Sequence, residues 1–135
     1  MLLEEPGSPL ASSWRREDPE IAVWALTALE LAAGLERRCR LGNAEQDNRR
    51  AVFERLDGWA GHWLEISDLV AVRRRARPLL ARHSLRAADA AQLAAALVFA
   101  EDDPTGKSFV CLDRDLAHAA EREGFRVLTW PTATT

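Results

Sequence analysis

The sequence predicts an α/β fold in which helices flank a parallel β-sheet. Short apolar runs typical of buried strands alternate along the chain with longer amphipathic stretches typical of helices. A length of 135 residues suffices for one domain with a core of its own. No internal repeat and no low-complexity linker divides the chain, so we expect residues 1–135 to form a single domain.

Short apolar runs predict the strands of this sheet. Each run is bounded by turn-forming or capping residues and is too short for a helix. The runs lie at residues 21–24, 63–66, 109–112 and 126–128. An acidic stretch that contains Pro and Gly, residues 101–106, predicts a loop before the third of these strands.

Longer amphipathic or alanine-rich stretches predict the helices. They lie at residues 8–16, 27–42, 44–60, 69–81, 86–100 and 116–123. Thr27, with Glu30 three residues later, matches a capping box at the start of the second helix. Asp68 is placed to cap the fourth helix, and Gly42 and Gly124 are placed to end the second and the last.

Composition excludes several classes of protein. A hydrophobic content of 47% and a charged content of 29% are ordinary for a globular domain, and the net charge of -3 argues against a polycation that coats nucleic acid. No apolar run approaches the roughly 18 residues of a membrane span, and the N-terminus lacks the features of a signal peptide. Cys39 and Cys111 fit no metal spacing and are expected as free thiols. We therefore expect a cytoplasmic protein without a membrane partner.

Asp89 is an acid on an apolar helix face, and it is the first candidate for a functional residue. It is the only acid in the alanine-rich helix expected at residues 86–100, and helical spacing aligns it with Leu85, Leu93 and Ala96. A carboxylate on an apolar face is costly unless a cation or a hydrogen-bond network compensates it. The position therefore predicts a partner for Asp89.

Glu30 and Asp113 are two further acids in apolar surroundings. Glu30 follows the expected strand at residues 21–24, and Asp113 directly follows the one at residues 109–112. Ligands of open α/β sheets gather at the carboxyl ends of the strands, so we expect both acids to meet Asp89 there. Converging carboxylates repel one another, and a divalent cation compensates them. Oxygen ligands without histidine or cysteine favour Mg²⁺ or Mn²⁺.

Each acid also has a purely structural interpretation. Glu30 can be the capping-box partner of Thr27, Asp89 a first-turn acid that suits the helix dipole, and Asp113 a helix N-cap. The residue pattern alone leaves the two interpretations open.

Three blocks of sequence resemble the PIN domain family, and in particular the VapC-type toxins of bacterial toxin–antitoxin pairs. Glu30 lies in WALTALELAAGL, Asp89 in LRAADAAQLAAAL and Asp113 in FVCLDRDLAHAAEREGF. The second block is the most specific, the third is fairly specific and the first is weak alone, and the resemblance runs over essentially the whole chain in the family's order of elements. The resemblance implies a three-layer α/β/α fold with a central parallel sheet.

The resemblance also implies a function. PIN-domain toxins are Mg²⁺-dependent endoribonucleases, in which acidic residues bind one or two metal ions that activate a water for attack on an RNA phosphodiester. Glu30, Asp89 and Asp113 would then be metal ligands and catalytic residues. Thr27 or Asp115 would lie next to these ligands and support them without binding the metal. The implied partners are an RNA substrate, a second copy in a homodimer and a cognate antitoxin that covers the acids.

The chain departs from the family at its start. The family opens with a strand that ends in an aspartate, and the first residues of this chain resemble the segment after that strand. Glu4 and Glu5 are poor substitutes for the aspartate. Either the natural protein is longer, or the chain is a truncated remnant, and we expect the 135-residue form to be a weak nuclease of marginal stability. Robust Mg²⁺-dependent RNA cleavage by this form would refute that expectation.

Two other hypotheses compete with this one. A catalytically impaired PIN-like remnant could serve as a protein-interaction module. Gly106-Lys107-Ser108 suggests a P-loop, but it lacks the earlier glycine and precedes a strand instead of following one.

The arginines at residues 73, 74, 75 and 77 predict either a solvated helix face or phosphate contacts.

Overall fold

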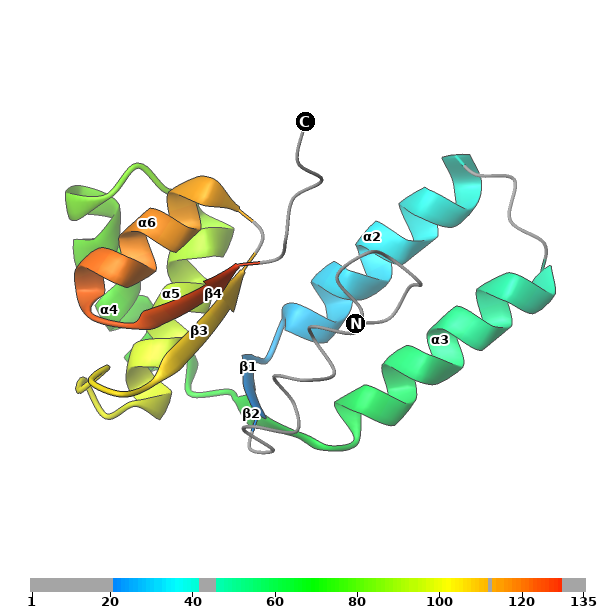
Figure 1. The fold of residues 1–135 in the computed structure, drawn as a ribbon, viewed down its shortest axis with the longest axis horizontal. Helices are drawn as coiled ribbons and strands as arrows, with labels where there is room; N and C mark the ends of the chain where they lie inside the picture. The colour runs from blue at the N-terminus through cyan, green and yellow to red at the C-terminus, as the bar shows by residue number, and fades with distance from the viewer. Residues whose placement is uncertain (1–20, 42–45, 112, 130–135) are drawn as a thin grey trace. The chain divides into compact units, whose positions relative to one another are not determined.

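The computed structural model describes residues 21–41, 46–111 and 113–129, and it is a mixed α/β structure (Figure 1). The expected helix at 8–16, Glu4, Glu5, Gly42 and Leu112 lie outside the described residues. The described strands form two small parallel sheets, one of β1 with β2 and one of β3 with β4. A single central sheet with helices on both faces stays a prediction.

The strand and helix positions expected from the sequence largely agree with the structure. The strands are β1 (Ile21–Trp24), β2 (Trp63–Ile66), β3 (Ser108–Cys111) and β4 (Arg126–Thr129). The helices are α2 (Thr27–Leu41), α3 (Gln46–Ala60), α4 (Leu69–Arg82), α5 (Ala87–Phe99) and α6 (Arg114–Glu123). Within the described ranges, no helix is long and apolar enough to cross a bilayer.

Two helix starts differ from expectation. The Glu30 N–H donates to the Leu26 carbonyl at 2.9 Å, so Leu26 occupies the cap position and Thr27 is the first helical residue. The predicted capping of α2 by Thr27 is therefore wrong. Helix α6 begins at Arg114, two residues before the expected start, because the Asp113 carboxylate caps its first turn.

The chain divides into two compact units. The first comprises residues 1–21 and 25–64, and the second comprises residues 22–24 and 65–135. In the first unit α2 packs on α3 through a small core of Leu35 and Leu56. The partly buried side chains against that core are Leu31, Ala32, Val52, Phe53 and Trp63.

The second unit has the denser core. Helix α5 packs on α4 and α6, and α6 packs on β3 and β4. The alanines of α5 and α6 allow these close approaches, and the buried residues of the two helices include Ala90, Leu93, Ala94, Leu116 and Ala120. The rings of Phe109 and Phe125 lie 5.7 Å apart beside the sheet. Strand β3 runs parallel to β4, with Phe109 opposite Val127.

Gly124 ends α6 in a conformation that requires glycine. Its φ of 109° lies in the left-handed region, and it closes the helix with its N–H directed to the Ala120 and Glu121 carbonyls. A Cβ at this position would meet the Pro104 Cγ at 2.9 Å. The predicted helix end is confirmed, and the glycine also allows the close approach of the loop before β3.

Candidate functional site

Asp89 lies in the first turn of α5, on the half-buried side of the helix. Its side chain is 19% exposed, with Ala90 and Leu93 of the same helix fully buried nearby in sequence. The nearest described cation is Arg86, whose Nε is 3.9 Å from the Asp89 Oδ2, but the Arg86 side chain is 88% exposed. So exposed and distant an ion pair compensates the carboxylate weakly.

Asp113 stands at the carboxyl end of β3 and caps α6. Its Oδ1 accepts hydrogen bonds from the Asp115 N–H at 2.8 Å and from the Leu116 N–H at 3.3 Å. The predicted N-cap role is confirmed. Since both of these bonds use one carboxylate oxygen, the cap does not engage the second oxygen.

The second unit brings Asp89 and Asp113 into each other's electrostatic field. Burial raises the pKa of the Asp89 carboxyl, and the charges of Asp113 and Asp115 raise it further, while Arg86 opposes them. Asp113 and Asp89 also act on Cys111, where burial together with these two charges raises the pKa of the thiol to about 11. Two segments of the second unit, the first turn of α5 and residues 111–115, thus interact electrostatically, and we call Asp89, Asp113 and Asp115 the acidic cluster.

The other predicted site residues occupy different places. Glu30 is half-buried in the first turn of α2 in the first unit, and Thr27 precedes it by one turn. Asp115 is exposed in the first turn of α6, where its charge suits the helix dipole. The second unit therefore brings Asp89, Asp113 and Asp115 into one electrostatic environment, and Glu30 belongs to the first unit.

The donor chemistry at the acidic cluster fits a hard divalent cation. Across the three described ranges, no three His, Cys, Asp or Glu side chains are arranged to hold one metal ion. The Asp89 and Asp113 carboxylates nevertheless supply the oxygen ligands that Mg²⁺ or Mn²⁺ prefers, and the cation that pairs with Asp89 among the described residues is the exposed Arg86, 3.9 Å away. The raised pKa keeps the Cys111 thiol protonated near neutral pH in the metal-free protein.

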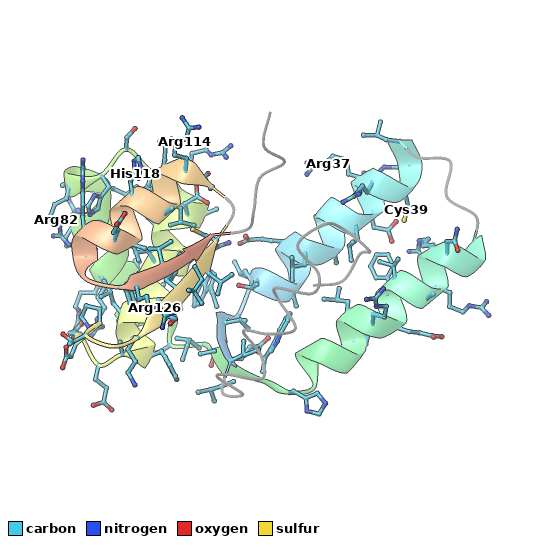
Figure 2. All side chains as sticks on the ribbon, in the orientation of Figure 1. Arg37, Cys39, Arg82, Arg114, His118 and Arg126 are labelled. Atoms are coloured by element: carbon cyan, nitrogen blue, oxygen red, sulfur yellow. The ribbon has the colours of Figure 1, made fainter. Side chains whose placement is uncertain are left out.

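Sequence reasoning missed two features of this unit. Cys111 borders the acids, and its Sγ lies 3.7 Å from the Asp113 carbonyl oxygen. Its place at the end of β3, two residues before Asp113, was the available signal. A second network joins His83 and Arg82 to Glu123, with N–O distances of 2.7 and 2.9 Å (Figure 2 labels Arg82). No sequence signal pairs residues so far apart along the chain.

The Glu123 network ties the end of α4 to the end of α6. Burial raises the pKa of the Glu123 carboxyl, but the hydrogen bonds from Arg82 and His83 outweigh it and leave the pKa below its ordinary value. The His83 side chain is only 7% exposed, so this bond is shielded from water. The network fixes the two helices that carry the flanks of the acidic cluster.

Comparison with known proteins adds no relative. The chain matches no protein-family model, and no curated protein matches it at a significant level.

Proposed function

We propose that the protein is a PIN-like, VapC-type toxin, a Mg²⁺- or Mn²⁺-dependent endoribonuclease that cleaves RNA phosphodiester bonds. The observation that carries the proposal is the approach of Asp89 and Asp113 at the carboxyl end of β3. Burial raises the pKa of the Asp89 carboxyl, and the charge of Asp113 raises it further. Two half-buried carboxylates, one after a strand and one in the first turn of a helix, form an electrostatic environment that a divalent ion neutralises, and the exposed Arg86 compensates only Asp89, and weakly.

In this proposal the chain's own residues position the reaction. Asp89 and Asp113 would hold the cation, and Glu30 would join them in a three-layer fold with one central sheet. When bound, the metal supplies a water of lowered pKa and charge stabilisation for the attacking and leaving oxygens. The two amides on Asp113 fix the orientation of its carboxylate, and the packing of α5 fixes Asp89.

The partners are part of the same proposal. RNA is the substrate, a second copy forms a homodimer, and a cognate antitoxin protein covers the acids. Thr27 and Asp115 are proposed as supporting residues beside the ligands. Under this proposal the protein works in the cytoplasm.

One observation favours the alternative of a catalytically impaired interaction module. Helix α2 exposes Leu29 to 67% and Leu41 to 80%, which is a large apolar exposure for one helix. A module of this kind would keep its binding surface and lack metal-dependent cleavage. The two functions are therefore separated by a cleavage assay.

The test compares Asp89→Asn with a matched control. Asp57 is an exposed acid of α3, so Asp57→Asn removes the same charge away from the cluster. On a labelled single-stranded RNA with Mg²⁺, the protein should cleave, Asp57→Asn should match it, and Asp89→Asn should lose about 100-fold or more. Cleavage that survives Asp89→Asn, or that needs no divalent ion, would contradict the proposal.

A further inference from the structure

The outer face of α4 carries a cluster of arginines around an open hollow. The hollow has a volume of about 390 Å³ and is lined by Val70, Arg73, Arg74 and Arg77. These positions are three, four and seven residues apart, so helical geometry places them on one face. All of them are exposed, and we call Arg73, Arg74 and Arg77 the arginine face.

The charges of the arginine face are not neutralised within the described part of the chain. Other arginines have carboxylate partners: Arg75 pairs with Asp102 at 2.7 Å, and Arg82 pairs with Glu123 at 2.9 Å. Among the described residues, no carboxylate pairs with any member of the arginine face. Like charges one turn apart repel each other on a helix, so the cluster does not serve the stability of α4.

Helix α4 presents these side chains from a rigid base. Val72 and Leu79 are fully buried on the opposite side of the helix. The Asp68 side chain caps the first turn by accepting from the Ala71 N–H at 3.0 Å. The guanidinium groups therefore project from a fixed backbone, and their planar donor forks suit the oxygens of phosphate groups.

The acidic cluster of the same unit makes a separate cationic surface necessary for an RNA-cleaving protein. Asp89, Asp113 and Asp115 repel the phosphates of RNA, and the whole chain carries a net charge of -3. A polyanion binds such a protein only through a local positive surface. No aromatic side chain lines the hollow, so base stacking is not offered there and backbone phosphates are the groups that fit.

We propose that the arginine face binds the phosphate backbone of single-stranded RNA, without reading its sequence. The inference rests on the proposed ribonuclease function for the identity of its ligand. Each guanidinium donates to non-bridging phosphate oxygens, and Val70 forms the apolar floor of the hollow. Binding at this face is electrostatic and falls with rising salt.

The test measures RNA binding without cleavage. Fluorescence anisotropy of a labelled single-stranded RNA is recorded in EDTA over a range of salt concentrations. The test variant carries Arg73→Gln, Arg74→Gln and Arg77→Gln. The control carries Arg37→Gln, Arg50→Gln and Arg55→Gln, three exposed arginines of α2 and α3 with the same total charge (Arg37 projects from α2 in Figure 2).

The expected result is specific to the arginine face. Loss of three phosphate contacts should reduce the slope of log affinity against log salt by about 2 and weaken binding roughly tenfold or more at low salt. The control should keep the slope of the unmodified protein. Equal slopes for the two variants, absence of salt-dependent RNA binding, or displacement of RNA by polyglutamate but not by polyphosphate would overturn the inference.

The two proposals fail in distinguishable ways. Binding in EDTA is scored without any cleavage, so loss of the proposed nuclease function leaves the binding result interpretable. If Asp89-dependent cleavage is found and the arginine variant still binds RNA with an unchanged slope, the arginine face alone is excluded. If RNA binds through the arginine face and no cleavage occurs, the nuclease assignment alone fails.

Discussion

The two compact units differ in how they bury their apolar residues. In the first unit, the small core joins α2 and α3 through Leu35 and Leu56, while Leu29 and Leu41 are exposed. In the second unit, α5 and α6 pack against each other and bury six alanines, Ala90, Ala94, Ala95, Ala117, Ala119 and Ala120. The second unit also carries Asp89 and Asp113, so these two proposed metal ligands lie in the unit with the denser core.

This difference in packing explains how the second unit retains the half-buried charge of Asp89. Asp89 lies in a helix whose Ala90, Leu93 and Ala94 are fully buried, so a rotation that hydrated the carboxylate would expose these apolar side chains. Its raised pKa is the electrostatic consequence. A loosely packed helix would relieve the same charge by a small shift.

The largest expected effect is on the packing of α5. Leu93→Ala removes a fully buried side chain one turn after Asp89 and should lower the free energy of unfolding by about 3 kcal/mol. Leu29→Ala on α2 changes a side chain that is 67% exposed and should cost less than about 0.5 kcal/mol. Urea titration measures both, and equal losses would contradict the contrast between the units.

Replacing glycine by alanine should lower the free energy of unfolding at Gly124 in the second unit and raise it at Gly58 in the first. Gly124→Ala places a Cβ against Pro104 in a left-handed conformation and should destabilise by about 1–2 kcal/mol. Gly58→Ala in α3 meets nothing within 4 Å and should stabilise by about 0.5–1 kcal/mol, because alanine is the better helix former. Thermal unfolding of the two variants tests the sign, and a stabilising Gly124→Ala would refute the packing described for the end of α6.

Two substitutions at Asp113 separate its capping role from its charge. Asp113→Ala removes the acceptor for the amides of Asp115 and Leu116 and should cost about 1 kcal/mol. Asp113→Asn keeps an acceptor of similar capping strength and should change stability by only a few tenths of a kcal/mol. Both substitutions should abolish the stabilisation of the folded protein by Mg²⁺ or Mn²⁺. A response retained by Asp113→Asn would exclude the carboxylate as a metal ligand.

The carboxyl groups of Asp89 and Glu123 should make the free energy of unfolding depend on pH in opposite directions. The pKa of Asp89 is raised in the folded state, so its ionised form opposes folding and stability is regained as pH falls through that raised pKa. The pKa of Glu123 is lowered, so its contribution is present above the ordinary pKa and is lost as pH falls through the lowered one. Unfolding curves of Asp89→Asn and Glu123→Gln at several acidic pH values measure the two contributions, and shifts of the same sign would contradict these assignments.

The sequence predicts the local elements well because periodicity and caps are local signals. The strand at Trp63–Ile66 agrees with expectation to the residue, and Asp68 caps α4 as its position suggested. Thr27 failed as a cap because Leu26 offers its carbonyl to the first helical hydrogen bond. A side chain that can cap does not fix which residue begins the helix.

Only part of the candidate site could be predicted from the sequence. Asp89 and Asp113 could be paired because each stands at the start of a helix and one comes directly after a strand. Cys111 lies beside Asp113 because it precedes it by two residues, but the link from His83 to Glu123 across 40 residues arises from tertiary packing. No periodicity or spacing in the chain predicts such contacts.

The most direct test of the acidic cluster is thermal unfolding of the protein and of Asp89→Asn, each with EDTA and with millimolar Mg²⁺. Without metal, Asp89→Asn should unfold at the higher temperature, because it removes a half-buried charge near Asp113. With Mg²⁺, only the unmodified protein should gain stability, by about 2.7 kcal/mol at a hundredfold excess over Kd. An equal gain in both proteins, or no gain in the unmodified one, would contradict a cation site at Asp89 and Asp113.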